Sequence, residues 1–272
     1  MTSPHSLKDR LRDGRVLLGP ILMELATPGL AVTLADAGFD FLLWDLEHAP
    51  FDAPTVAHTI LAGRQAGLPS IVKLGDLERW AVQRYLDYGA SGIQVPHVES
   101  ADELRDLARW MRYPPLGERS LVFGVGNTGF RSVDFGTHIA DANEETLLIP
   151  MIETRRGVEE VEIILSAGAP DAVFLGTGDL SCSYGVPGRT AHPVVKEAAE
   201  RVIAACRGHG IPAAIFADDP HHQPHLKVST LICGHKLSYL QTQPGASYES
   251  SERTHARSGL TPAPEPETSS WT

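Results

Sequence analysis

Apolar runs of strand length alternate with segments of helical periodicity along most of the chain. The strand-like runs include VLLGPIL, FDFLLWDLEH, PSIVKL, GIQVPHV, LLIPMIE, AVFLGTG, PAAIFAD and TLICG, and helical segments such as APTVAHTILAGRQAG separate them. Such alternation predicts repeated β-α units, in which helices cover a parallel sheet. Residues 119–125, RSLVFGV, form a weaker run that we also count as a strand. We therefore expect an α/β fold.

The number of strand-like runs, about eight, favours a closed (β/α)₈ TIM barrel over an open doubly wound sheet, which would give the same alternation. Polar residues at the C-terminal ends of many runs favour the same choice. A chain of 272 residues accommodates one such barrel, which commonly takes about 250. We predict a single barrel domain over residues 1–245. Residues 246–272 are rich in Ser, Thr, Pro and charge, which predicts a disordered tail.

Composition and charge exclude several classes of protein. The formal charge of −11 and the lack of a Lys/Arg run oppose nucleic-acid binding, which needs a basic surface. No stretch of about 18 apolar residues and no signal-like N-terminus occurs, so we expect no membrane association and a cytoplasmic location. Cys182, Cys206 and Cys233 are widely spaced without a CxxC pair, which fits structural thiols in a reducing compartment.

Two segments interrupt the alternation. Residues 117–143 are rich in glycine and polar residues, and predict a long loop near the mouth of the barrel. The segment FADDPHHQPHLK contains His221, His222 and His225, which are a possible transition-metal site. The adjacent prolines favour a surface loop instead.

Polar side chains follow the predicted strands at the ends that share one mouth in a barrel. With residues 119–125 counted as the fifth strand, the residues that follow strands two, three, four, six and seven are Asp45, Glu47 and His48, then Lys73, His97, Glu153 and Asp179. Taken singly, Glu153 and Asp179 are also typical of helix N-caps or surface residues. On neighbouring strands they indicate a site for a hard divalent cation such as Mg²⁺ or Mn²⁺, with coordination positions left for water and a 2-oxo acid.

The other residues at this edge suit chemistry on such a substrate. A bound cation would polarise the keto group, and His48 could move a proton while Asp45 orients its ring. Lys73 offers a positive charge to the enolate oxygen or to the substrate carboxylate. Each residue also has a structural alternative: hydrogen bonding at the rim for His48 and His97, and an ion pair for Lys73. A further alternative is a Schiff base on Lys73, which would need a lowered pKa.

Several segments carry a resemblance to a known family. WDLEHAPFD, LDYGASGIQVPHVESADEL, RYPPLGERS, IPMIETRRGVEEV and AVFLGTGDLSCSYGVPG resemble the HpcH/HpaI family of class II pyruvate aldolases, over about residues 18–240. The resemblance implies a (β/α)₈ barrel that assembles as a homo-oligomer, a hexamer or trimer of dimers with helix exchange. It also implies reversible aldol cleavage of 4-hydroxy-2-oxo acids with Mg²⁺, Mn²⁺ or Co²⁺.

The resemblance assigns roles to individual residues. Glu153 and Asp179 would be the metal ligands, and Asp45 with His48 would form the acid-base pair. Asp87 would assist the site of a neighbouring subunit. The substrate carboxylate would be received by the backbone of three consecutive residues, Gly176, Thr177 and Gly178.

Three positions depart from the family pattern. Lys73 stands where the family usually has an arginine that contacts the oxo group. Lysine keeps the positive charge but lacks the planar fork of the guanidinium group. Met151, expected at the substrate, replaces a residue that is polar in the bacterial aldolases. His97 also departs from the bacterial aldolases, and at this position the chain is similar to macrophomate synthase, a relative that decarboxylates oxaloacetate. Another relative makes citrate from oxaloacetate. We therefore expect a lyase acting on a 2-oxo acid, with such a biosynthetic enzyme or a catalytically weak metabolite-binding barrel as alternatives.

Overall fold

The computed structural model describes residues 6–168, 170–216 and 231–235. Its elements follow one another along the chain as α1 (Leu7–Arg12), β1 (Leu17–Leu22), α2 (Pro28–Asp36), β2 (Leu42–Asp45), α3 (Ala53–Gln65), β3 (Ser70–Lys73), α4 (Arg79–Asp87), β4 (Gly92–Val95), α5 (Ala101–Met111), the 3₁₀ turn η1 (Gly126–Thr128), α6 (Phe135–Glu145), β5 (Leu147–Ile152), α7 (Arg155–Glu159), α8 (Val161–Gly168), β6 (Val173–Leu175), α9 (Thr177–Ser183), α10 (Pro193–Gly208), β7 (Ala213–Phe216) and β8 (Leu231–His235).

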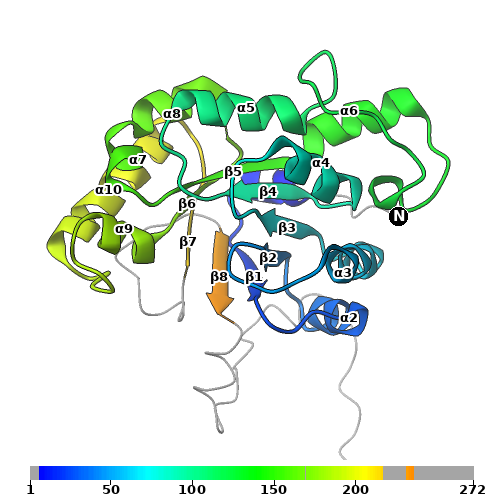
Figure 1. Cartoon of the computed structure of the whole chain (residues 1–272), viewed down its shortest axis with the longest axis horizontal. Coiled ribbons are helices and arrows are strands. Elements are labelled where there is room, and N and C mark those ends of the chain that lie inside the picture. The colour runs from blue at the N-terminus through cyan, green and yellow to red at the C-terminus, as the bar shows by residue number, and fades with distance from the viewer. Residues whose placement is uncertain (1–5, 169, 217–230, 236–272) are drawn as a thin grey trace, which may run out of the picture.

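The strands form one parallel sheet in sequence order, and β8 pairs with β1 to close it. Helices lie around the outside of the sheet (Figure 1). The predicted α/β fold with a parallel sheet is confirmed. The segments that follow β7 and β8 lie outside the described residues, as do the predicted tail over 246–272 and the three histidines at 221, 222 and 225.

Two apolar layers separate the sheet from solvent. Inside the ring of strands, Phe41, Leu43 and Phe174 belong to one buried cluster. On the outer face, Leu42 and Trp44 pack against the helices in a second cluster. Because successive strand residues point to opposite faces, these neighbours on β2 serve different layers. The strands are therefore buried on both faces, as the continuous apolar runs in the sequence predict.

The strand expected over residues 119–125 does not form, so that prediction was wrong. The backbone N–H of Ser120 donates to Oε1 of Gln83, and its carbonyl accepts from Nε2 of the same side chain. This segment pairs with the side chains of α4 instead of joining the sheet. Glu153 consequently follows the fifth strand and Asp179 follows the sixth.

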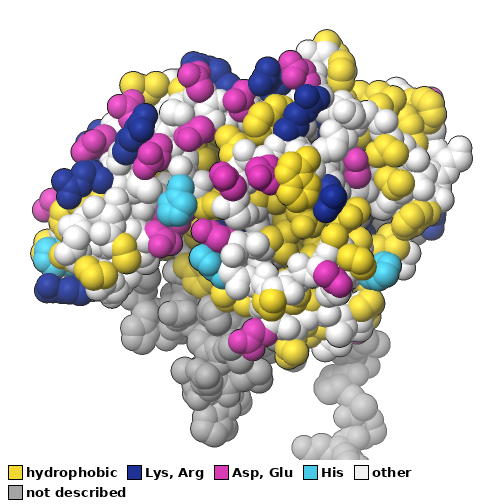
Figure 2. Space-filling model, in the orientation of Figure 1, with side chains coloured by type: hydrophobic (Ala, Val, Ile, Leu, Met, Phe, Trp, Pro, Cys, Tyr) yellow, Lys and Arg dark blue, Asp and Glu magenta, His cyan; other side chains and the backbone are white. Residues whose placement is uncertain are grey.

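The surface carries both signs of charge. On the face shown in Figure 2, Lys and Arg side chains are interspersed with Asp and Glu, rather than gathered in one patch. None of the helices in the described part of the chain combines the length and the apolar character that a membrane span requires.

Candidate active site

Glu153 follows β5 and is held by the loop after β4. Its side chain is only 2% exposed, and its Oε1 accepts a hydrogen bond of 2.9 Å from the backbone N–H of His97. His97 has a φ of +52°, a left-handed conformation that is uncommon for a residue other than glycine. The Nδ1 atom of the same histidine lies 3.6 Å from Oε1 of Glu153. A strained backbone residue thus aims its N–H at a buried carboxylate, an arrangement typical of functional sites.

Asp179 lies in the first turn of α9, directly after β6. Burial raises the pKa of Glu153, and the negative charge of Asp179 raises it further, against the lowering effects of His97 and Lys73. The two acids therefore share one electrostatic environment at the same end of the sheet, as the sequence predicted. A cation placed between them would relieve both the burial cost and the repulsion.

Lys73 ends β3 and is 7% exposed. Its Nζ lies 2.7 Å from Oε2 of Glu47 and 3.2 Å from Oδ2 of Asp45. Burial by itself would lower the pKa of Lys73, but the hydrogen bond to Glu47 and the charges of Asp45 and Glu47 outweigh it, and the net shift is upward. Lys73 is therefore an ammonium ion at neutral pH. Glu47, which the sequence placed at this edge without a role, is one of its two partners.

His48 and Asp45 are in contact, but through the backbone. Oδ1 of Asp45 accepts hydrogen bonds from the backbone N–H groups of Glu47 at 3.0 Å and His48 at 2.9 Å. The His48 ring is about half exposed, and its Nε2 lies 3.6 Å from Oε2 of Glu47. Asp45 therefore fixes the turn that carries His48, and the orientation of the ring by Asp45 that we expected is not the contact observed.

Gly176 lies against Glu153 at the start of α9. A Cβ atom built at position 176 would lie 2.7 Å from Cβ of Glu153. Thr177 and Gly178 follow in the first turn of the helix, where backbone N–H groups have no acceptor within the helix itself. The three residues expected to receive the substrate carboxylate are thus next to the carboxylate pair.

Two further buried side chains, Met151 on β5 and Gln94 on β4, lie on strands next to this site. Met151 is 5% exposed and belongs to the interior apolar cluster. Gln94 on β4 is 1% exposed, and neither atom of its amide has a hydrogen-bond partner. We did not select Gln94 from the sequence. The available signal was a polar residue in the apolar run GIQV, next in the sheet to the strand that ends in Lys73.

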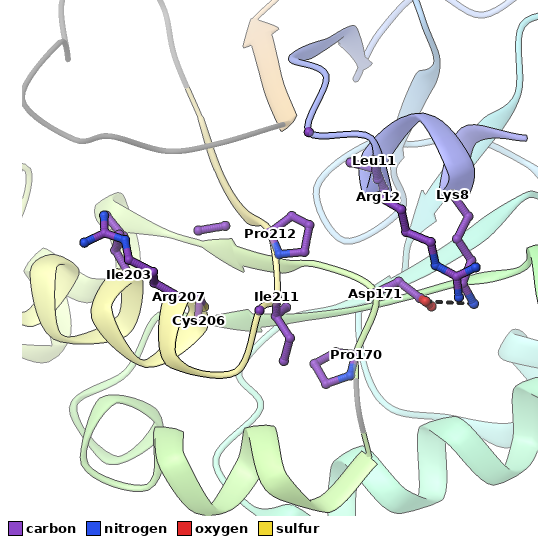
Figure 3. A pocket seen from close by; sticks show the side chains of 13 residues that line it. Lys8, Leu11, Arg12, Pro170, Asp171, Ile203, Cys206, Arg207, Ile211 and Pro212 are labelled. Atoms are coloured by element: carbon purple, nitrogen blue, oxygen red, sulfur yellow. Dashed lines mark ion pairs between the residues drawn. The ribbon is translucent and has the colours of Figure 1, made fainter. Parts of the chain in front are cut away.

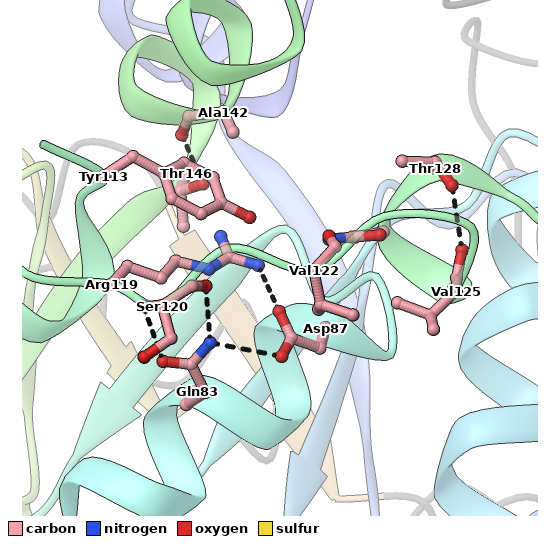
Figure 4. A network of polar contacts seen from close by, with 12 residues as sticks. Gln83, Asp87, Tyr113, Arg119, Ser120, Val122, Val125, Thr128, Ala142 and Thr146 are labelled. Carbon is pink, nitrogen blue, oxygen red and sulfur yellow. Dashed lines mark hydrogen bonds and ion pairs between the residues drawn. The ribbon is translucent and has the colours of Figure 1, made fainter. Parts of the chain in front are cut away.

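Asp87 does not join this site within the chain. It ends α4, where its Oδ1 lies 2.9 Å from Nη2 of Arg119 and its Oδ2 accepts from Gln83 (Figure 4). The Arg119 guanidinium also stacks over the Tyr113 ring, 4.5 Å from its centroid. Asp87 thus anchors the segment that follows α5.

A separate pocket lies at the opposite end of the strands (Figure 3). It is lined by residues that precede β6 and β7, including Asp171, which pairs with Lys8 at 2.8 Å. Cys206 on α10 also lines it, and burial raises the pKa of this thiol to about 12. Its lining residues precede or begin the strands, whereas the candidate site residues end or follow them, so this pocket is distinct from the candidate active site.

Two carboxylates fit a divalent cation that takes the rest of its ligands from water and substrate. No cluster of three or more His, Cys, Asp or Glu side chains suited to a metal occurs among the described residues. The carboxylate oxygens of Glu153 and Asp179 fit an oxygen-binding cation that takes its other ligands from water and substrate.

The parallel sheet carries an acidic edge and a buried lysine at the carboxyl ends of its strands, the arrangement of an α/β protein with a candidate active site at that edge. The chain belongs to the HpcH/HpaI aldolase/citrate lyase family, whose model matches residues 21–226. This membership confirms the family that the sequence predicted. It also confirms the predicted class of enzyme, a carbon–carbon lyase, because aldolases and citrate lyases are carbon–carbon lyases.

Named relatives and solved structures agree with the family. A hydroxypyruvate/pyruvate aldolase of Paraburkholderia phytofirmans is 36% identical over 223 residues, covering 80% of this chain and 85% of that protein. A 2-keto-3-deoxy-L-rhamnonate aldolase of Salmonella gallinarum is 32% identical, covering 79% of this chain and 80% of that protein. The crystal structure of an HpcH/HpaI aldolase from Desulfitobacterium hafniense has a TM-score of 0.82 and 30% identity, covering 88% of this chain and 93% of that one.

Proposed function

We propose that this protein is a metal-dependent aldolase that cleaves 4-hydroxy-2-oxo acids to pyruvate, or a close 2-oxo acid, and an aldehyde. The observation that carries the proposal is the buried Glu153, which shares its surroundings with Asp179 and the Lys73 ammonium group. Relatives named for pyruvate and for keto-deoxy sugar acids support this class of substrate.

Glu153 and Asp179 would hold the cation, and Mg²⁺, Mn²⁺ or Co²⁺ would suit their oxygen atoms. The bound cation supplies Lewis acidity, which favours enolate character at C3 of the 2-oxo acid. The backbone N–H of His97 keeps one oxygen of Glu153 in place.

The protein's own groups position the substrate and move the proton. Lys73 presents its positive charge to the oxygen on which negative charge develops. The backbone from Gly176 to Gly178 receives the substrate carboxylate. His48, on a turn fixed by Asp45, accepts the proton of the 4-hydroxyl group as the carbon–carbon bond breaks, and returns a proton to the enolate carbon.

A Schiff base on Lys73 is disfavoured by its surroundings. Such chemistry needs a neutral amine, and Asp45 and Glu47 instead raise the pKa of Lys73. Borohydride added with pyruvate should therefore leave Lys73 unmodified.

Decarboxylation of oxaloacetate, or addition of its enolate to another acceptor, would use the same residues. The relatives named above are aldolases, which favours cleavage. The test is a screen of pyruvate release from 4-hydroxy-2-oxo acids and from oxaloacetate with several divalent metals. Release from the hydroxy acids supports the proposal, whereas binding without any turnover favours a metabolite-binding barrel.

We also propose a domain organisation, a cellular location and an oligomeric state for the protein. Residues 1–245 would complete a single (β/α)₈ barrel, followed by the tail over 246–272. The protein would act in the cytoplasm, which fits its free thiols at Cys182 and Cys206. It would form a homo-oligomer, either a hexamer or a trimer of dimers. In this oligomer, Asp87 and its partner Arg119 would border a neighbouring subunit. The oligomer is testable by light scattering.

A further inference from the structure

Gln94 lies in the same row of the sheet as two residues of the candidate active site. The register pairs Asp45 on β2 with Lys73 on β3, and Lys73 in turn with Gln94 on β4. Paired residues of parallel strands direct their side chains to the same face. Because Asp45 and Lys73 are in contact inside the barrel, Gln94 also points into the barrel, on the other side of Lys73.

The interior assignment of Gln94 has independent support. Gly92, two residues earlier on β4, faces the interior, since a Cβ atom there would lie 2.8 Å from Cβ of Leu147 and 3.6 Å from Cγ1 of Ile71. Both are members of the interior apolar cluster. Residues two apart on a strand share a face, so Gln94 extends from the same side.

The amide of Gln94 is buried without hydrogen bonds, which destabilises the fold. Its side chain is 1% exposed, and both its oxygen and its nitrogen lack a partner. A buried polar group without a hydrogen bond destabilises a fold, and most such groups in proteins are satisfied. An unpaired amide beside a site that binds a charged ligand is explained if the ligand completes its hydrogen bonds.

Lys73 by itself has limited capacity for that ligand. An ammonium group has three N–H donors, and Asp45 and Glu47 occupy two of them. One N–H is left for a substrate oxygen. A 2-oxo acid carries several oxygen acceptors in one plane, so a second donor from a neighbouring strand would fix its orientation.

We propose that Gln94 is a substrate-binding residue whose Nε2 donates a hydrogen bond to an oxygen of the 2-oxo acid beside the one that Lys73 contacts. This assignment rests on the proposed function. It makes the β3–β4 side of the interior the recognition surface for the oxo-acid group, while the metal ligands come from the loops after β5 and β6. On the next strand, Ile149 pairs with Gln94 and Met151 follows two residues later, and neither side chain has a hydrogen-bond donor. The amide of Gln94 is therefore the donor on this side of the interior.

The test compares Gln94→Leu with the wild type in ligand binding and in stability. Oxalate, a planar analogue of the pyruvate enolate, is titrated by calorimetry in the presence of Mn²⁺, and thermal unfolding is followed without ligand. We expect the Kd for oxalate to rise about tenfold or more, as for the loss of a hydrogen bond to a charged group. The Tm should rise by about 2–4 °C, because an unsatisfied amide is removed.

Thr59→Val is the matched control. Thr59 lies on α3, is fully buried, and its hydroxyl likewise has no partner. This change should alter stability in the same direction and leave the Kd for oxalate unchanged. Gln94→Met, which keeps the length of the side chain, serves as the second variant if the leucine variant does not fold.

Opposite results would overturn the assignment. An unchanged Kd for oxalate, or a lower Tm with binding intact, would show that the amide serves the fold and not the ligand. The lyase proposal fails separately: a wild-type protein that releases no pyruvate but binds oxalate, with the affinity lost in Gln94→Leu, would overturn the reaction while supporting the role of Gln94.

Discussion

Gly176 approaches Glu153 so closely that no side chain fits between them: a Cβ atom at position 176 would lie 2.7 Å from Cβ of Glu153 and 3.1 Å from its carboxyl carbon. Glu153 is buried and cannot swing into solvent to make room. The backbone at the start of α9 therefore sets the position of the carboxylate, in addition to supplying Asp179 a few residues later.

Gly176→Ala should accordingly displace the Glu153 carboxylate. We expect affinity for Mn²⁺, measured by calorimetry or electron paramagnetic resonance, to fall by about tenfold or more, as is usual when the support of a metal ligand is lost. Gly29→Ala on α2 is the control, because a Cβ atom there has nothing within 4 Å. Equal Mn²⁺ affinity in Gly176→Ala and the wild type would mean that Glu153 does not hold the metal.

Glu153 should make the stability of the metal-free protein dependent on pH. Burial raises its pKa above the ordinary value of 4.5, with Asp179 adding to the shift, so the folded protein binds this proton more tightly than the unfolded chain does. The contribution of Glu153 to stability is thus fully present below that value and is lost as pH rises through the raised pKa. Glu153→Gln should be more stable than the wild type near pH 8, in the presence of EDTA.

The measurement is thermal unfolding from about pH 4 to about pH 8. The difference in Tm between wild type and Glu153→Gln should grow with pH. Glu200→Gln, at an exposed position on α10, should follow the wild type throughout. A difference that stays constant with pH would show that the Glu153 pKa is not raised.

Lys73 should contribute its charge and not a covalent bond. Replacement by methionine keeps an unbranched side chain of similar length and leaves Asp45 and Glu47 without their cation. We expect kcat/KM for pyruvate release to fall about 10- to 100-fold, the effect of one hydrogen bond to a charged group. Lys73→Arg, which retains the charge, should keep more activity than Lys73→Met. A lysine-specific adduct after borohydride treatment with pyruvate would contradict this role.

The ion pair between Arg119 and Asp87 should contribute to stability. Arg119 is almost fully buried, with its guanidinium over the Tyr113 ring. Arg119→Met leaves the Asp87 carboxylate without its charged partner, and we expect the free energy of unfolding in urea to fall by about 3 kcal/mol. Arg105→Met, which breaks an exposed pair with Asp102, should cost less than about 1 kcal/mol. Equal losses in the two variants would contradict the structural role.

The sequence predicted the sheet well because each strand is buried on both faces and reads as a continuous apolar run. It failed at residues 119–125, where a weaker apolar run pairs with the Gln83 side chain instead of another strand. Apolarity alone does not distinguish these outcomes, since the decisive partner lies on α4. The strands after that point were therefore numbered one too high.

The sequence indicated which polar residues stand at the ends of the strands, but not the contacts that they make. Strand-end positions indicated Glu153, Asp179 and Lys73, and the charges of Asp179 and Lys73 act on the pKa of Glu153. The sequence did not show that Glu47 is a partner of Lys73, or that Asp45 bonds the backbone of His48. Those contacts depend on the turn after β2, whose geometry has no periodic signature.

In the proposed function, the acids after β5 and β6 hold a divalent cation on which cleavage depends. The most direct measurement is pyruvate release from a 4-hydroxy-2-oxo acid by protein stripped with EDTA, before and after addition of Mg²⁺, Mn²⁺ or Co²⁺. We expect no release from the stripped protein, recovery on addition of metal, and no recovery in Glu153→Ala or Asp179→Ala. Full turnover by the stripped protein would contradict it.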